Sequence, residues 1–203
     1  MDETRVTNKA ELRGSLYEPP RISHESRGER FYQFSMEVFR LSGVGDRINI
    51  IAREQLLDTL GINGDKLGVT GELRSFNNKS GEGSRLVITV FARELCFDSG
   101  PDVNNVFLSG TICKHPNLRT TPMGREICDL MLAVNRRYGR SDYLPCIAWG
   151  IRAREASLWP VGTAVSVEGR LQSRNYIKNV GGLPLEKTAF EVSVIDIKPA
   201  LNL

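Results

Sequence analysis

Two aromatic side chains share one face of a strand predicted over residues 142–149. Apolar and small residues occupy the alternate positions, and this period of two is typical of a strand with one face in a hydrophobic core. Tyr143 and Trp149 therefore lie on the outer face, six residues apart. Exposed rings can stack on unpaired bases, so this face favours contact with a single-stranded nucleic acid.

A second strand, predicted over 164–176, ends in a basic and aromatic segment. Its residues alternate strictly, which places apolar or small side chains on one face and Arg170, Arg174 and Tyr176 on the other. Guanidinium groups can bind phosphates beside rings that hold bases. The pattern thus predicts a cationic platform next to the aromatic face.

A predicted hairpin, RRYGRS, concentrates further basic residues. Its charged and aromatic members are Arg136, Arg137, Tyr138 and Arg140. Three arginines around one ring and a glycine favour a finger that closes over a bound strand. A merely solvated basic surface would have the same composition, and that alternative stays open.

The composition is that of an ordinary globular protein of 203 residues, with 40% hydrophobic and 25% charged residues. The net charge is +3, but residues 1–100 hold 14 Lys/Arg against 15 Asp/Glu, whereas residues 101–203 hold 13 against 9. The second half therefore suits a polyanion better. No apolar run approaches a membrane span and the first residues lack a signal-peptide pattern, so we expect a cytoplasmic, nucleoid-associated protein with no membrane partner.

The sequence predicts no enzyme, no cofactor and no metal site. Four scattered cysteines and two histidines form no ligand motif, and the chain has no P-loop, GxSxG or HExxH motif. We expect Cys128 and Cys146 to be small core residues. Asp46 and Asp142 occupy equivalent ends of predicted hairpins, and we interpret both as turn residues.

The chain contains an internal repeat. An offset of 96 residues aligns 8–52 with 104–148 without a gap and gives eleven identities in 45 positions, including glycines and a proline. Further along, an offset of 98 aligns Gly71 with Gly169. Two copies are too few for a solenoid, so each copy is expected to form a closed domain.

Each copy has the same order of predicted elements, three strands, a short helix and two further strands. In the first copy a strand over 9–16 precedes a turn-rich segment over 17–30. The order matches the OB-fold, a five-stranded Greek-key barrel. We therefore expect an all-β protein of two tandem OB-folds, each with one short helix between the third and fourth strands. The predicted boundaries are a first domain over 1–98, a linker over 99–104 and a second domain over 105–203.

Four segments of the second copy carry a family likeness: NNVFLSGTICKHPNLRTTPMG, LMLAVNRRYG, DYLPCIAWG and VEGRLQSRNY. Together they resemble the bacterial single-stranded DNA-binding proteins over nearly all of residues 104–197. The resemblance implies that four aromatic side chains stack on bases, namely Tyr138, Tyr143, Trp149 and Tyr176. It also implies an assembly of four OB domains, so a chain with two is expected to form a homodimer.

The first copy departs from this pattern. The positions of the four aromatics are occupied by Ser42, Arg47, Arg53 and Asn78. The outer face keeps as candidate nucleic-acid contacts Arg47, Arg53, Arg74 and Phe76. Because each stacked base contributes about 1–3 kcal/mol, we expect the first copy to be a much weaker site.

These features predict sequence-independent binding and protection of single-stranded DNA in replication, recombination or repair, mainly by the second domain. The alternative is an interaction module like the related primosomal replication protein N, with slight affinity for nucleic acid and a partner surface near Phe39 and Phe76. RNA is a third possibility, because stacking accepts either backbone. The family commonly ends in an acidic tip that recruits replication and repair proteins, and the last residues, KPALNL, lack it. Recruitment of such partners is therefore open.

Overall fold

The computed structural model describes residues 7–58, 66–78, 86–136, 139–180 and 183–200. The chain divides into two units. The N-terminal unit comprises Ala10–Asn104 together with Gln172–Phe190, and the C-terminal unit comprises Met1–Lys9, Asn105–Leu171 and Glu191–Leu203. The structure confirms the prediction of an all-β chain built from OB barrels with short helices.

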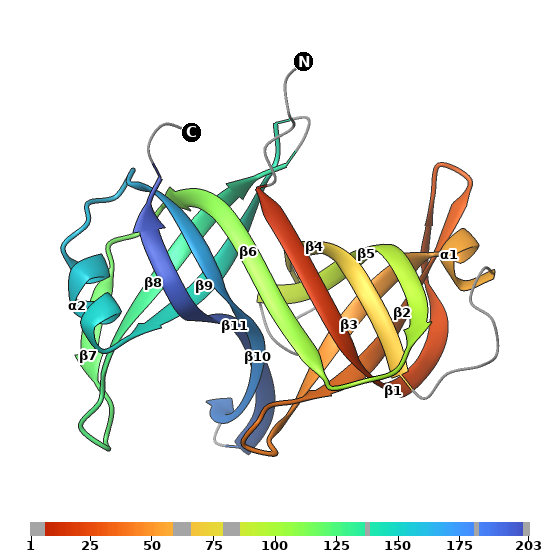
Figure 1. Ribbon diagram of the computed structural model, residues 1–203, viewed down its shortest axis with the longest axis horizontal. Helices are drawn as coiled ribbons and strands as arrows, with labels where there is room; N and C mark the ends of the chain where they lie inside the picture. The colour runs from red at the N-terminus through yellow and green to blue at the C-terminus, as the bar shows by residue number, and fades with distance from the viewer. Residues whose placement is uncertain (1–6, 59–65, 79–85, 137–138, 181–182, 201–203) are drawn as a thin grey trace. The chain divides into compact units, whose positions relative to one another are not determined.

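The N-terminal unit contains a closed barrel of five strands (Figure 1). The strands are β1 (Asn8–Ser26), β2 (Glu29–Phe39), β3 (Gly45–Arg53), β4 (Lys66–Asn77) and β5 (Leu86–Asp98), and the helix α1 (Glu54–Asp58) follows β3. β1 pairs antiparallel with β2 and β4, β2 with β3, and β4 with β5. The parallel pairing of β3 with β5 closes the barrel.

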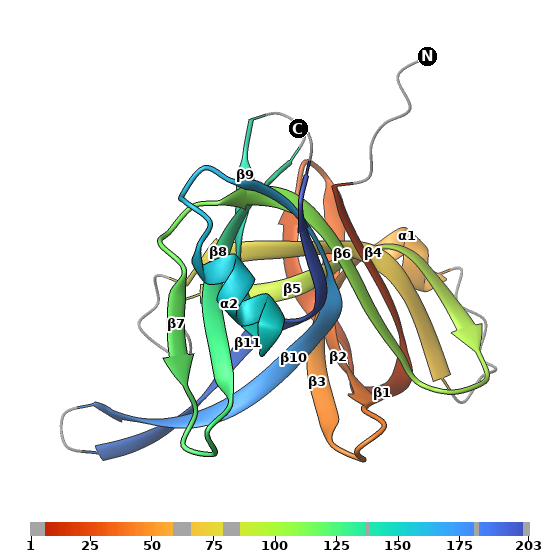
Figure 2. The ribbon, with the colours of Figure 1, turned by 60° about the vertical axis from the view of Figure 1, so that its left-hand side comes forward.

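The second copy repeats this order of strands, with the short β7 added after its first strand (Figure 2). Its elements are β6 (Val103–Ile112), β7 (Asn117–Thr120), β8 (Glu126–Asn135), β9 (Ser141–Trp149), α2 (Ile151–Ser157), β10 (Ala164–Val180) and β11 (Leu183–Pro199). β6 pairs with β8 and β10, β8 with β9, and β9 runs parallel to β11. Helix α2 contacts β7, β8 and β9, with Ala153 and Ala156 as its buried residues.

Alternating apolar residues form the core of each barrel. In β2 the side chains of Phe34, Met36 and Val38 are buried, as the period of two predicts. In β10, Val165 and Val167 are fully buried on the face that the sequence assigned to the core. The outer faces of the same strands are thereby fixed, because a shift of register by one residue would expose every one of these side chains.

The first strand extends further than the sequence predicts. Residues 17–30, expected to be turn-rich, instead continue β1 to Ser26, and the segment pairs with β2 as far as Ser26 opposite Glu29. The register shifts between Glu18 and Arg21, where two prolines stand. Proline lacks the N–H that a sheet ladder requires, so an irregularity at this point lets the strand continue past both rings.

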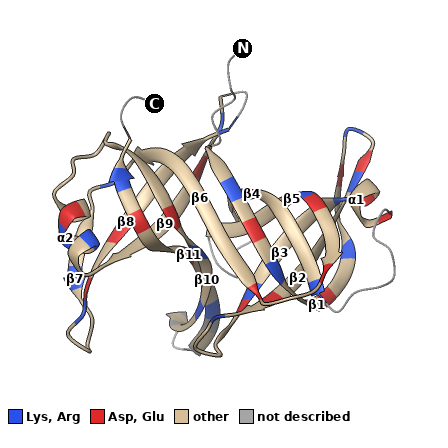
Figure 3. Ribbon diagram, viewed as in Figure 1, with Lys and Arg blue, Asp and Glu red and all other residues tan. Residues whose placement is uncertain are grey.

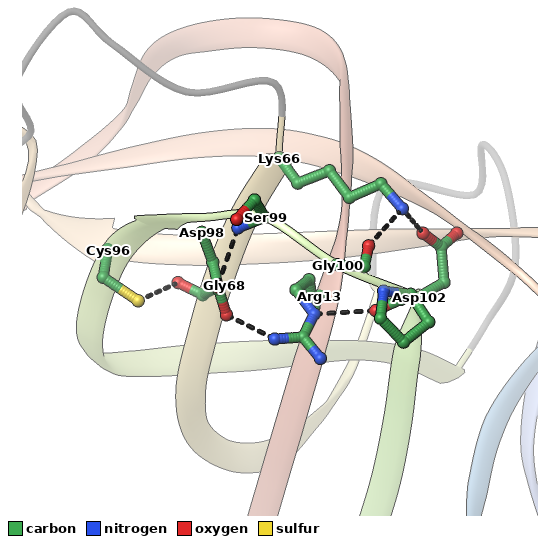
Figure 4. A network of polar contacts seen from close by, with 9 residues as sticks. Arg13, Lys66, Gly68, Cys96, Asp98, Ser99, Gly100 and Asp102 are labelled. Atoms are coloured by element: carbon green, nitrogen blue, oxygen red, sulfur yellow. Dashed lines mark hydrogen bonds and ion pairs between the residues drawn. The ribbon is translucent and has the colours of Figure 1, made fainter.

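Polar contacts hold the segment after β5 against the N-terminal barrel (Figure 4). Arg13 in β1 donates to the Asp98 carboxylate at 2.5 Å and to the carbonyl oxygen of Pro101 at 2.7 Å. Lys66 in β4 donates to the Asp102 carboxylate and to a neighbouring carbonyl oxygen. The backbone N–H of Phe39 also donates to Asp102, at 2.6 Å. The predicted linker is therefore bound along much of its length.

Among the described residues, no helix is long and apolar enough to span a membrane.

Candidate nucleic-acid interface

The two aromatic side chains predicted on the outer face of β9 are exposed. Tyr143 is 52% exposed and Trp149 is 40% exposed, whereas the residues that alternate with them in β9 are buried. Across the sheet Tyr143 lies opposite Ala133 and Trp149 lies opposite Ile127 in β8. Ala133 and Ile127 have smaller side chains than the rings opposite them, so both rings project from the outer surface of β8 and β9.

The outer face of β9 is not uniformly open between these rings. Ile147 shares the face but is only 7% exposed, and it pairs with Ser193 of β11, which is 6% exposed. The alternation that places Tyr143 and Trp149 on the outer face places Ile147 there too. Parity gives the face of a side chain but not what covers it, so Tyr143 and Trp149 are two separate exposed rings.

The basic end of β10 belongs to the part of the chain assigned to the N-terminal unit. Arg174 is exposed, Tyr176 is half-buried, and the guanidinium carbon of Arg174 lies 6.0 Å from the ring centroid of Tyr176. Arg170 is half-buried and lies in the C-terminal unit, whereas Gln172 between them is only 9% exposed. The predicted cationic and aromatic face of β10 is therefore accessible mainly at the end of the strand, at Arg174 and Tyr176.

In the predicted basic hairpin, Arg136 already binds a carboxylate of the protein. The guanidinium of Arg136 donates two hydrogen bonds to the fully buried carboxylate of Asp142, one of them at 2.6 Å. Arg140 is exposed. Arg137 and Tyr138 lie outside the described residues.

The candidate arginines of the first copy are also paired, each with a nearby carboxylate. Their partners are Glu37 for Arg47, Glu29 for Arg53 and Glu72 for Arg74. The guanidinium of Arg47 also lies 3.9 Å from the ring centroid of Tyr17, an exposed ring that the sequence analysis did not select. Phe76 and Phe39 are each 50% exposed. Basic and acidic residues are interspersed along the strands of this copy (Figure 3).

Asp46 and Asp142 are buried ion-pair partners, which corrects their interpretation as turn residues. Both carboxylates are completely buried, and each accepts two hydrogen bonds from the arginine six residues before it, Arg40 or Arg136. The repeat alignment already pairs these residues between the copies, and that recurrence was the available signal. A carboxylate removed from water requires such a partner because its desolvation is costly.

The described residues hold no cluster of three or more side chains suited to a metal ion. Cys128 and Cys146 are buried free thiols, as expected of core residues. Burial raises the pKa of both thiols, so neither is a reactive thiolate near neutral pH.

Comparison with known proteins places the second copy in a family. The single-strand binding protein family matches residues 103–199. Single-stranded DNA-binding protein A of Bacillus subtilis is 36% identical over 86 residues, which cover 39% of this chain and 50% of that protein. Single-stranded DNA-binding protein 2 of Listeria monocytogenes is 36% identical over 107 residues, which cover 49% of this chain and 67% of that protein. For most of these curated relatives, the chain spans about half of their length.

The fold similarity extends over both copies. The wild-type single-stranded DNA binding protein from Thermus aquaticus superposes with a TM-score of 0.76 at 22% identity, and the match covers 96% of this chain and 93% of that one. At this identity the comparison shows a shared fold. From the sequence matches to the second copy, the chain belongs to the single-strand binding protein family.

Proposed function

We propose that the chain binds single-stranded DNA without sequence preference, mainly through residues 105–203. The observation that carries this proposal is the pair of exposed rings, Tyr143 and Trp149, on one face of β9 within the segment that the family matches. Every base has a ring face, so stacking on such residues tolerates any sequence. The family is also non-enzymatic, in keeping with the sequence prediction.

Arginines draw the strand in and rings hold its bases. Arg140 and Arg174 are exposed and can replace counterions on the phosphates, which makes affinity depend on salt. Tyr143, Trp149 and Tyr176 then stack on bases that are splayed out of a helix. Arg136 acts differently, because Asp142 binds its guanidinium, and it positions the start of β9.

A wider role follows from this activity. Binding without sequence preference protects exposed single strands during replication, recombination and repair, and would place the protein on the nucleoid of the cytoplasm. The family resemblance further supports a homodimer with four OB domains, which light scattering would detect as a mass about twice the 22.7 kDa of one chain.

The test is fluorescence anisotropy of a labelled oligothymidine titrated with the wild-type chain, Trp149→Ala and Trp149→Phe. Loss of one stacked base costs about 1–3 kcal/mol, so we expect Trp149→Ala to bind about 5- to 150-fold more weakly. Trp149→Phe keeps a ring and should retain most of the affinity. Trp159→Phe, a change at the half-buried second tryptophan, is the control and should bind like wild type.

A matching duplex and a low-salt condition complete the experiment. Salt-sensitive binding to the single strand alone supports the proposal. If the wild-type chain binds no oligothymidine at low salt, the proposal is wrong, and the exposed Phe39 and Phe76 become candidates for docking a protein partner.

A further inference from the structure

The strand register gives Arg53 the place in the first copy that Trp149 has in the second. Arg53 is the last residue of β3 and pairs with Phe31 of β2. Trp149 is the last residue of β9 and pairs with Ile127 of β8. The pair Arg53–Phe31 therefore corresponds to the pair Trp149–Ile127. At this position the first copy has a cation where the second has a ring.

On the next strand across the sheet, the first copy has a ring where the second copy has a cation. His24 of β1 pairs with Phe31, and in the second copy the corresponding partner of Ile127 is Arg119 of β7. The His24 and Phe31 rings stack in parallel, with centroids 4.7 Å apart and planes 4° apart. His24 is exposed and Phe31 is only 8% exposed, so His24 presents the outer ring of the pair.

A third ring, that of Phe91 on β5, lies beside these paired residues. Phe91 pairs with Ile51 of β3, and the corresponding residue of the second copy is Ser193, which pairs with Ile147. The Phe91 ring lies 6.1 Å from that of Phe31. The first copy thus has Arg53 at the position of Trp149, with the ring of Phe31 on one neighbouring strand and the ring of Phe91 on the other.

Two exposed guanidinium groups flank the third ring. The guanidinium carbon of Arg93 lies 5.1 Å from the centroid of Phe91 and that of Arg53 lies 5.9 Å from it. Their side chains are 45% and 44% exposed. Their ion pairs with Glu72 and Glu29 are partly solvated, and such surface pairs contribute little, so a phosphate can compete with the carboxylates.

We propose that this cross-strand row, His24, Phe31, Arg53, Phe91 and Arg93, is a second binding site for single-stranded DNA. The exposed ring of His24 and the half-buried ring of Phe91 offer surfaces for bases, Phe31 supports them from beneath, and the two arginines bind phosphates. The proposal rests on the function proposed above and extends it to the first copy, which the four aromatic positions of the family would leave nearly without a base platform.

The location of the tryptophans separates the two sites. Both tryptophans of the chain, Trp149 and Trp159, lie in the second copy, so quenching of intrinsic fluorescence reports on that copy. An oligothymidine of about 10 nucleotides is within the length that one OB-fold covers, whereas one of about 70 can engage both copies. The anisotropy of the labelled long oligonucleotide therefore reports on both sites.

We expect Arg53→Gln and Arg93→Gln each to weaken binding of the long oligonucleotide and to reduce the salt slope by about 0.7. Tryptophan quenching by the short oligonucleotide should stay unchanged. Arg21→Gln removes an exposed arginine of β1 that lies outside the row, and it is the charge-matched control. His24→Ala should weaken long-oligonucleotide binding about 5-fold or more, and His24→Phe should restore it, which a loss of charge alone would not explain.

The outcomes of the two proposals are distinct. If wild type quenches no tryptophan fluorescence and binds neither oligonucleotide, the function proposed above is wrong. If wild type binds both, but Arg53→Gln and Arg93→Gln match Arg21→Gln and His24→Ala matches wild type, the row is not a binding site and only this inference is overturned. Circular dichroism of each variant checks that the fold is intact.

Discussion

The backbone N–H of Ser173 donates a hydrogen bond of 2.9 Å to Oδ1 of Asp46, although the two residues are 127 positions apart. The Ser173 hydroxyl lies 3.4 Å from the same oxygen and accepts a hydrogen bond of 3.2 Å from the backbone N–H of Arg47. Arg40 donates two further hydrogen bonds to Asp46. One buried carboxylate therefore holds the segment that leads to Arg174 within the N-terminal unit.

Removal of this carboxylate should destabilise the N-terminal unit strongly. Asp46→Ala removes the buried carboxylate that the mostly buried guanidinium of Arg40 binds, and breaking a buried pair in this way costs about 3–5 kcal/mol of unfolding free energy. Ser173→Ala removes only the hydroxyl contacts and should cost about 0.5–1.5 kcal/mol. Urea unfolding followed by circular dichroism measures both. Equal, small losses for the two variants would contradict this assignment.

A methyl group at Gly71 or Gly169 should disturb the barrels to a similar degree. A Cβ at Gly71 would lie 2.3 Å from the carbonyl oxygen of Phe91, and one at Gly169 would lie 2.4 Å from that of Ser193. Both contacts are with backbone, which cannot swing away, so each alanine variant should lose about 1–3 kcal/mol in urea unfolding. Thr70→Ala is the neighbouring control and should cost less. Wild-type stability of either glycine variant would argue against this close packing.

Arginine variants should separate the proposed phosphate contacts from other exposed positive charges. Arg174 is exposed, and Arg174→Gln should reduce the salt dependence of oligothymidine binding by about 0.7 in the logarithmic slope. Arg152 on α2 is also exposed but lies outside the residues proposed to contact DNA, so Arg152→Gln should leave the slope unchanged. Titrations at four salt concentrations provide the comparison, and identical slopes for the two variants would remove Arg174 from the site.

The pH dependence of stability should contain a contribution from Asp98. Its hydrogen bond with Arg13, and then that with the Ser99 N–H, hold the pKa of the Asp98 carboxyl below its usual value. Because the folded pKa is lower than the unfolded one, the ionised carboxylate stabilises the fold above about pH 4, and this stabilisation is lost as the pH falls through the folded pKa. Asp98→Asn should therefore lower the melting temperature more at pH 7 than at about pH 3.

The control for this effect is Asp58→Asn, at the exposed end of α1. It should change the melting temperature little at either pH. A loss at Asp98→Asn that is the same at both pH values would show that the side chain acts by its shape instead of its charge.

The sequence predicts most of the fold because the barrels obey local rules. Alternation locates core residues such as Met36 and Val167, and the repeat locates the two short helices. The extension of β1 was missed, since the prolines and polar residues of 17–30 have the composition of a loop and only pairing with β2 makes them a strand.

The candidate site is less predictable because the exposure and the partners of its side chains depend on how the strands pair. Parity correctly leaves Tyr143 and Trp149 uncovered but cannot show that Ile147 is buried. It also cannot show that Asp142 binds Arg136, or that His24 stacks on Phe31 from the end of an extended β1. Each of these contacts forms between paired strands, so it depends on the register of the pairing, which alternation along a single strand does not give.

The assignment of Gln172–Phe190 to the N-terminal unit means that neither unit is one continuous stretch of the chain. β10 begins in one unit and ends in the other, so no single cut yields two complete halves. A fragment ending at residue 104 would lose Ser173, and a fragment beginning there would leave the ends of β10 and β11 without their neighbours. Each unit thus contains residues from both halves of the sequence, and we expect the chain to melt in one cooperative transition instead of two.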